Sequence, residues 1–162
     1  MNNFNIENNS PEFKQSSLDA DIDNYDPSAI SSKGLVYIGD KLLIYRRDNE
    51  APTHPLFLDV PGGRTEGAES PFETWKREVK EEFNLDVTRE GIVWSRKYNL
   101  EDKPGKSVYF NVSIFPESSI DDVQLGGEGI EWMLMTPEEF LAQQDVHQPF
   151  LDRTRAYVES LQ

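Results

Sequence analysis

The stretch GRTEGAESPFETWKREVKEEFNL, from Gly63 to Leu85, contains a helix start, an apolar stripe and a group of acids. Ser70 is a favourable N-cap residue, and Pro71 suits the first helical position. Glu73 stands three residues after Ser70 and completes the pattern of a capping box. We therefore predict a helix over about residues 71–83, and the rest of the fold is interpreted around it.

The predicted helix has an apolar side and an acidic side that lie next to each other. The apolar residues that recur at helical spacing are Phe72, Trp75, Val79 and Phe83. At about 100° per residue, Glu78 and Glu82 stack one turn apart, and Glu81 lies on the same side. Like charges at this spacing destabilise a bare helix, so a positive charge should compensate them. The candidates are Arg77, Lys80 or a bound metal ion.

Clustered oxygen donors at this point suggest a site for a hard divalent ion. Mg²⁺ binds carboxylate and carbonyl oxygens and takes its remaining ligands from water and phosphate. The three helical carboxylates and the free carbonyls of the Gly62–Gly63 turn would supply such a set. A run of acids by itself is also typical of a solvated helix face, so the run REVKEE alone does not decide between the two interpretations.

The wider spacing resembles the Nudix box. That pattern reads Gly, five residues, Glu, seven residues, Arg-Glu-apolar, one residue, Glu-Glu, one residue, Gly-apolar. The matching positions here are Gly63, Glu69, Arg77–Val79, Glu81–Glu82 and Leu85. The departure is Asn84, where the family has Gly, and Asn tolerates the same left-handed backbone.

The resemblance implies a fold and an activity. The fold would be α/β, a Nudix-type α/β/α sandwich with a mixed β-sheet and the box as a loop–helix–loop motif. The activity would be hydrolysis of a nucleoside diphosphate linked to another moiety, at a phosphorus-containing acid anhydride, with Mg²⁺ or Mn²⁺. A nucleoside triphosphate or an oxidised dNTP suits a small member. Nucleotide sugars, ADP-ribose and dinucleoside polyphosphates stay open.

The resemblance also implies metal ligands. Glu78 and Glu82 would bind the metal directly, and Glu81 would bind it directly or through water. The backbone carbonyl of Gly62 would complete the set. Outside the box, Glu128 lies in a glycine-rich loop, where a further metal ligand or general base is expected, with an exposed loop acid as the alternative.

Four basic or acidic residues are expected to support the loop or the substrate. The resemblance pairs Arg77 with Glu69. Arg46, or its neighbour Arg47, follows an apolar run, and Arg64 follows the glycine pair. A guanidinium at these points can hold a substrate phosphate by two hydrogen bonds. We select Arg46 and Arg64 as substrate ligands, and a surface ion pair with a neighbouring acid is the alternative.

Composition sets the broad class of protein. The chain has 162 residues, a net charge of −14 and no cysteine. This charge argues against a nucleic acid duplex or an anionic membrane as partner. The absence of cysteine excludes disulfides and zinc–thiolate sites, and no apolar run is long enough to span a bilayer. We predict a cytoplasmic protein with an acidic, flexible tail over residues 1–31 and one domain over residues 32–162.

The remaining chain is predicted to alternate between strands and helices. Strands are expected at about 33–38, 41–46, 56–60, 91–98, 107–115 and 130–135. Gly39-Asp40 is typical of a two-residue hairpin turn. Helices are expected at about 137–143 and 149–160. Such a pattern favours a layered domain with helices against a sheet.

Two other functions compete with the hydrolase. One is a Nudix-fold module that senses nucleotides without cleaving them, which would be expected to lack one or more box glutamates. The other is a scaffold protein with an acidic helix. The chain keeps all four box glutamates, which favours the enzyme. A homodimer is left open, with a small nucleotide as the expected substrate.

Overall fold

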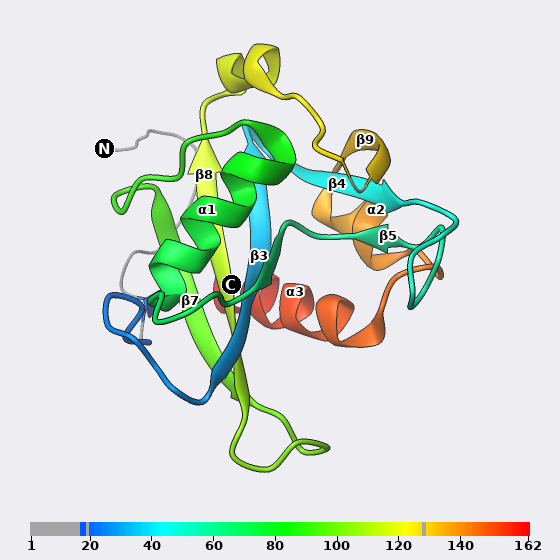
Figure 1. The fold of residues 1–162 in the computed structure, drawn as a ribbon. Coiled ribbons are helices and arrows are strands. Elements are labelled where there is room, and N and C mark those ends of the chain that lie inside the picture. Colours follow the sequence, from blue (N-terminus) through cyan, green and yellow to red (C-terminus); the bar gives the residue numbers. More distant parts are fainter. Residues whose placement is uncertain (1–16, 19, 128) are drawn as a thin grey trace.

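The computed structural model describes residues 17–18, 20–127 and 129–162, which form a mixed sheet with helices around it (Figure 1). The strands are β2 (Ser17–Leu18), β3 (Ala29–Ile38), β4 (Lys41–Arg47), β5 (Leu58–Asp59), β6 (Gly62–Arg64), β7 (Ile92–Asn99), β8 (Ser107–Phe115) and β9 (Gly129–Met135). The helices are α1 (Pro71–Phe83), α2 (Pro137–Leu141), α3 (Gln148–Ser160) and the 3₁₀ helix η1 (Glu117–Asp122). None of the described helices is long and apolar enough to span a bilayer.

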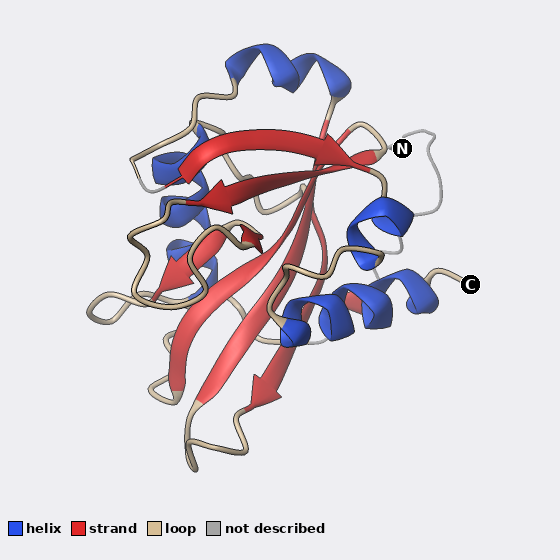
Figure 2. Cartoon of the chain, turned by 90° about the vertical axis from the view of Figure 1, so that its right-hand side faces the viewer, coloured by secondary structure: helices blue, strands red, loops and turns tan. Residues whose placement is uncertain are grey.

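β3 is the central strand of the sheet. The hydrogen-bonded order is β2-β7-β8-β3-β4-β5, with β6 paired to β3 and β9 paired to β4. β3 runs parallel to β8, and it is antiparallel to β6 near its start and to β4 near its end. Figures 1 and 2 show α1 on one side of this sheet and α3 on the other. The predicted α/β sandwich with a mixed sheet is therefore confirmed.

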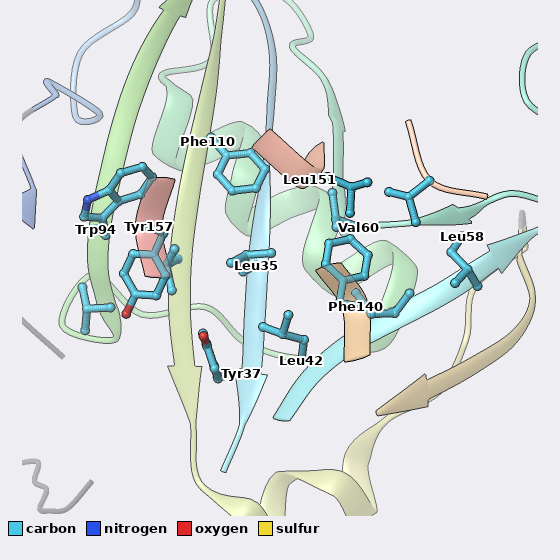
Figure 3. Close-up of a cluster of buried hydrophobic side chains, with 14 residues drawn as sticks. Leu35, Tyr37, Leu42, Leu58, Val60, Trp94, Phe110, Phe140, Leu151 and Tyr157 are labelled. Atoms are coloured by element: carbon cyan, nitrogen blue, oxygen red, sulfur yellow. The ribbon is translucent and has the colours of Figure 1, made fainter. Parts of the chain in front are cut away.

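Both faces of the central strands are buried. Leu35 and Tyr37 belong to the cluster that includes Tyr157 of α3, part of which Figure 3 shows. Their neighbours Val36 and Ile38 point to the other face and pack with α1. Successive side chains of a strand point to opposite faces, so a strand covered on both sides needs apolar residues at consecutive positions. This explains the unbroken apolar runs in the sequence.

The predicted helix at 71–83 is confirmed as α1. Ser70 and Glu73 form the complete capping box, and Asn84 ends the helix in the left-handed conformation, with φ of 62°. The buried indole of Trp75 donates to Ser113 Oγ on β8 at 2.9 Å. The apolar side thus fixes the helix to the sheet, and its acidic side is left at the edge of the packed layer.

The segment before β3 packs on the domain, which differs from the expected tail through residue 31. Ile22 is fully buried in the cluster under α1. Asp26 accepts hydrogen bonds from Tyr109 at 2.6 Å and from Ser28, and it pairs with Lys97 at 2.9 Å. Burial opposes ionisation, but these contacts hold the pKa of Asp26 well below its usual range. Because residues 20–28 are mostly polar, the sequence did not show that Ile22 belongs to the core or that Asp26 is held by hydrogen bonds. Residues 1–16 and 19 lie outside the described part of the chain.

Candidate active site

The acidic side of α1 faces a pocket of about 790 Å³, within the usual range for small-molecule sites. Its acidic wall consists of Glu66, Glu78, Glu81 and Glu82. Its basic residues are Lys33, Arg47 and Arg64. Glycine-rich backbone from β6 and from residues 125–129 completes the lining, together with Tyr45 and Thr53. The pocket therefore brings together charges of both signs from β3, β4, α1 and the segment of β6 with the loop after it.

Glu82 is the deepest acid of the box. Its carboxylate accepts the backbone N–H of Gly62 at 2.9 Å. Burial raises the pKa of Glu82 to about 8, because a charged carboxylate loses its hydration there. Among the described residues, no second hydrogen bond reaches this carboxylate, so one of its oxygens has acceptor capacity left for a ligand.

The glycine pair at 62–63 allows the backbone of β6 to lie against both the sheet and the helix. Gly62 has φ of 114°, and a Cβ there would overlap the backbone of Lys33. A Cβ on Gly63 would overlap the carboxyl group of Glu78. A side chain at position 62 would push β6 away from β3, so glycine is required there, whereas a side chain at position 63 would displace the carboxyl group of Glu78.

Arg77 supplies the positive charge that the helical acids require. Its guanidinium contacts Glu69 at 2.7 Å, Glu78 at 2.9 Å and Glu81 at 3.2 Å. It also donates to the carbonyl of Arg64 at 2.9 Å. The hydrogen bond from Arg77 lowers the pKa of Glu69 to about 2. The contact predicted between Arg77 and Glu69 is therefore present, and it ties the loop before α1 to the helix.

The donors suit a hard divalent ion in type and charge. Glu78 is largely buried, which raises its pKa, whereas the side chain of Glu81 is 59% exposed. Within the described residues, no three His, Asp or Glu side chains already converge as a ready metal site. Two of the acids are turned toward Arg77 instead. An incoming ion would therefore replace part of the charge that Arg77 now supplies.

A buried acid that contacts the pocket residues Lys33 and Arg47 was not predicted from the sequence. Asp59 on β5 accepts hydrogen bonds from Arg47 at 2.9 Å, from the Tyr45 hydroxyl at 3.1 Å and from the N–H of Val60 at 2.7 Å. Lys33 Nζ lies 3.4 Å from Oδ1 of Asp59, the oxygen that also accepts the N–H of Val60. Burial works against ionisation, but the fields of Lys33 and Arg47 lower the pKa of Asp59. The signal that could have identified Asp59 is its position inside the apolar run at residues 56–60, where an acid needs a buried partner.

The structure separates the two neighbouring arginines. Arg46 lies outside the pocket, where it pairs with Glu131 at 3.0 Å and Asp145 at 3.1 Å, whereas Arg47 lines the pocket. Strand alternation explains this difference, because Arg47 points to the same face of β4 as Tyr45. The expected substrate ligand Arg46 is therefore placed elsewhere, and period-two counting along the strand would have selected Arg47.

The loop before β9 closes the C-terminal end of α1. The N–H of Gln124 donates to the carbonyl of Phe83 at 3.1 Å, and that of Gly126 donates to the carbonyl of Glu82 at 2.7 Å. These bonds satisfy carbonyls that a helix end otherwise leaves free. Leu125, Gly126, Gly127 and Gly129 line the pocket, while the predicted ligand Glu128 lies outside the described residues.

Most of the predicted site residues are thus brought together. Those that line the pocket are Gly62, Arg64, Glu78, Glu81 and Glu82. Glu69 and Arg77 stand behind them as a supporting pair. The sequence interpretation missed Lys33 and Asp59, both contributed by strands outside the motif, and also Glu66, an acid of the loop within the motif.

Comparison with known proteins is in line with this geometry. The family model described as the NUDIX domain matches residues 32–154. A comparison with curated proteins gives no match. Among solved structures, a MutT protein from Methanosarcina mazei Go1 is 25% identical, with a TM-score of 0.65 and coverage of 82% of this chain and 94% of that one.

Two further structures share the fold. The E. coli dihydroneopterin triphosphate pyrophosphohydrolase has a TM-score of 0.60 at 17% identity, covering 85% of this chain and 99% of that one. A C. elegans Ap4A hydrolase has a TM-score of 0.58 at 21% identity, covering 80% of this chain and 98% of that one. Because the family model covers most of the chain, including the acidic pocket, the chain belongs to the Nudix family and is a hydrolase that acts on pyrophosphate bonds.

Proposed function

We propose that this protein hydrolyses a nucleoside diphosphate linked to another moiety, with a nucleoside triphosphate as the simplest substrate, and that it requires Mg²⁺ or Mn²⁺. The observation that carries the proposal is the half-buried carboxylate of Glu82, which accepts the N–H of Gly62 in the same pocket as Glu78 and Glu81. A buried acid with spare acceptor capacity is costly unless a positive ligand joins it.

The chain's own residues divide into a metal-binding wall and a phosphate-binding wall. Glu78, Glu81, Glu82 and the carbonyl of Gly62 would hold the ion, with Glu128 as a further predicted ligand. A bound divalent ion offsets the charge of the phosphoryl oxygens and makes a bound water more acidic. The carboxylates of the pocket are the groups available to accept the proton of the attacking water.

The basic side of the pocket suits the rest of a phosphate chain. Arg64 lies beside the glycine pair, and Arg47 is held in place by Asp59. A guanidinium fixed by a carboxylate loses little further freedom when it binds a phosphate oxygen. We assign these two arginines to the substrate, with Arg47 in the place that the sequence interpretation gave to Arg46.

The choice of substrate within this class rests on residues outside the box. The neighbours named above are an Ap4A hydrolase and a dihydroneopterin triphosphate pyrophosphohydrolase, so the organic group attached to the phosphate chain differs between them. Nucleotide sugars, ADP-ribose and dinucleoside polyphosphates therefore belong in the test. A cytoplasmic location and a homodimer stay predictions from the sequence.

The test is a panel of nucleotides, nucleotide sugars and dinucleotides incubated with Mg²⁺ or Mn²⁺, with products identified by mass. Glu82→Gln removes the ionisable carboxyl group and keeps the shape, and Glu101→Gln in the exposed turn after β7 is the matched control. We expect metal-dependent release of a nucleoside phosphate, lost in Glu82→Gln and kept in the control. Nucleotide binding without turnover across the panel would instead indicate a sensor module.

A further inference from the structure

The inner wall of the pocket carries a lysine that the Nudix box does not include. Lys33 lies on β3, directly opposite Gly62 in the ladder with β6. Its ammonium donates to the carbonyl of Gly62 at 3.3 Å, lies 3.4 Å from Asp59 Oδ1, and is 5.3 Å from the centre of the Phe150 ring. A carbonyl, a carboxylate and an aromatic face thus fix the ammonium, and its side chain is only 17% exposed.

The ammonium of Lys33 contacts the Gly62 carbonyl, which the proposed function assigns to the metal as a ligand. Lys33 binds the carbonyl of Gly62, and Glu82 binds the N–H of the same glycine at 2.9 Å. Lys33 is the main positive charge acting on Glu82, and its field also reaches Glu78. A tethered positive charge in this position repels a divalent cation that approaches these carboxylates.

Asp59 keeps the ammonium from swinging out of the pocket. Only 3% of Asp59 is exposed, and its oxygens are shared between Lys33, Arg47 and Tyr45. Moving the Lys33 ammonium away from Asp59 is unfavourable, because the negative charge of this buried carboxylate would then be less well compensated. The lysine is therefore built into the wall, and its charge stays in the pocket when an ion arrives.

We propose that Lys33 is a built-in counter-ion that keeps the substrate-free site weak for divalent metal, so that the metal enters together with the phosphates of the substrate. This inference rests on the proposed function of the same pocket. Before substrate arrives, Arg77 pairs with Glu78 and Glu81, and the ammonium of Lys33 occupies the Gly62 carbonyl beside Glu82. A phosphate chain adds oxygen ligands and negative charge, which outweigh the repulsion from one ammonium.

The measurement is the affinity of the full chain for Mn²⁺ without nucleotide, from the electron paramagnetic resonance signal of free Mn²⁺. Lys33→Met removes the charge and keeps a long side chain, and we expect it to bind Mn²⁺ about tenfold more tightly than the wild type. Lys33→Arg keeps the charge and should stay near the wild type. Lys41→Met, at the exposed start of β4, is the matched control and should change nothing. The gain should shrink at high salt, because screening weakens the repulsion.

A purely structural role for Lys33 predicts the opposite sign, because loosening Gly62 would weaken the ligand set. Unchanged or weaker Mn²⁺ binding by a Lys33→Met protein that still unfolds cooperatively would overturn the inference. If that variant does not fold, Lys33→Gln is compared with Lys33→Arg by the same measurement, with the same expected order. An active wild type with no gain in the variants rejects only the role of Lys33. A wild type that neither binds Mn²⁺ nor cleaves any nucleotide rejects the proposed function as well.

Discussion

The side-chain amide of Asn84 donates a hydrogen bond to the carbonyl of Asp122, with 3.1 Å between Nδ2 and O. Asn84 also ends α1 in the left-handed conformation, with φ of 62° and ψ of 31°. Glycine, the residue of the family pattern, would satisfy the backbone but could not make this contact. The one departure from the motif therefore attaches the end of η1, and the pocket loop that follows it, to α1.

Replacing Asn84 should separate its two roles. Asn84→Gly keeps the left-handed backbone and should leave the free energy of unfolding within about 0.5 kcal/mol of the wild type. Asn84→Ala should be about 1 kcal/mol less stable than Asn84→Gly, because a Cβ is disfavoured there. Urea unfolding measures both values. In Asn84→Gly the amide of Gly126 should also exchange its hydrogen faster, and equal exchange in both proteins would show that the amide contact does not hold the loop.

The pair of Arg77 and Glu69 should make the free energy of unfolding decrease at acidic pH. Its hydrogen bond lowers the pKa of Glu69 to about 2, so this contribution is present above the ordinary value of 4.5 and disappears as the pH falls toward 2. We expect Glu69→Gln to lose about 1 kcal/mol at pH 7, since the pair is partly exposed, and much less at pH 2.5. Denaturant unfolding at the two pH values measures the difference.

The matched control for this pair is Glu66→Gln. Glu66 also contacts Arg77, at 3.6 Å, but its side chain is 70% exposed. Its replacement should change stability by less than about 0.5 kcal/mol at either pH. A loss as large as that of Glu69→Gln would mean that the general field of the acids, and not the specific pair, stabilises the loop.

Glu82 should destabilise the metal-free protein in alkaline solution. Burial raises its pKa to about 8, so the folded state holds a proton that the unfolded state releases near 4.5. Stability contributed by the neutral form is therefore lost as the pH rises through 8. In the presence of a chelator, Glu82→Gln should melt about 3–8 °C above the wild type at pH 9 and close to it at pH 5. A variant that melts lower at pH 9 would contradict this account of the site.

Arg47 and Arg46 should differ in their effect on substrate binding. Arg47→Lys keeps a charge beside Asp59 but loses the planar fork, and we expect the KM to rise at least about fivefold. Arg46→Lys, on the next residue, should leave the KM close to that of the wild type, because Arg46 lies outside the pocket. Steady-state kinetics with the substrate identified by the panel will measure both. The reverse order would restore the original assignment of Arg46.

Local signals predicted what depends on neighbours in the sequence. Ser70, Pro71 and Glu73 specify the start of α1 through backbone contacts that lie within four residues, and Asn84 specifies its end. The hairpin at Gly39 is equally local, because a left-handed glycine turns the chain there. The helix and the hairpin can be predicted from the sequence because the contacts that specify them lie between residues close together in the chain.

Contacts between distant segments set what the sequence did not reveal. Lys33 lines the pocket because β6 lies against β3, and Asp59 can support Lys33 and Arg47 because β5 lies against β4. Ile22 is in a polar stretch, and only packing under α1 shows it to be a core residue. The neighbouring residues in the sequence do not indicate which distant strand or helix each of these residues contacts. The sequence pattern alone therefore could not assign them to the site or to the core.

The parallel pairing of β3 with β8 sets the order in which the domain can be completed. β3 contacts β8 along its length, yet roughly 70 residues separate the two strands, a delay of several seconds at ordinary rates of synthesis. Until then β3 can pair only with β4 and β6, and α1 can cover only one of its two apolar faces. The first half of the chain is therefore expected to expose apolar surface that favours aggregation. The sheet is completed when β8 inserts between β7 and β3.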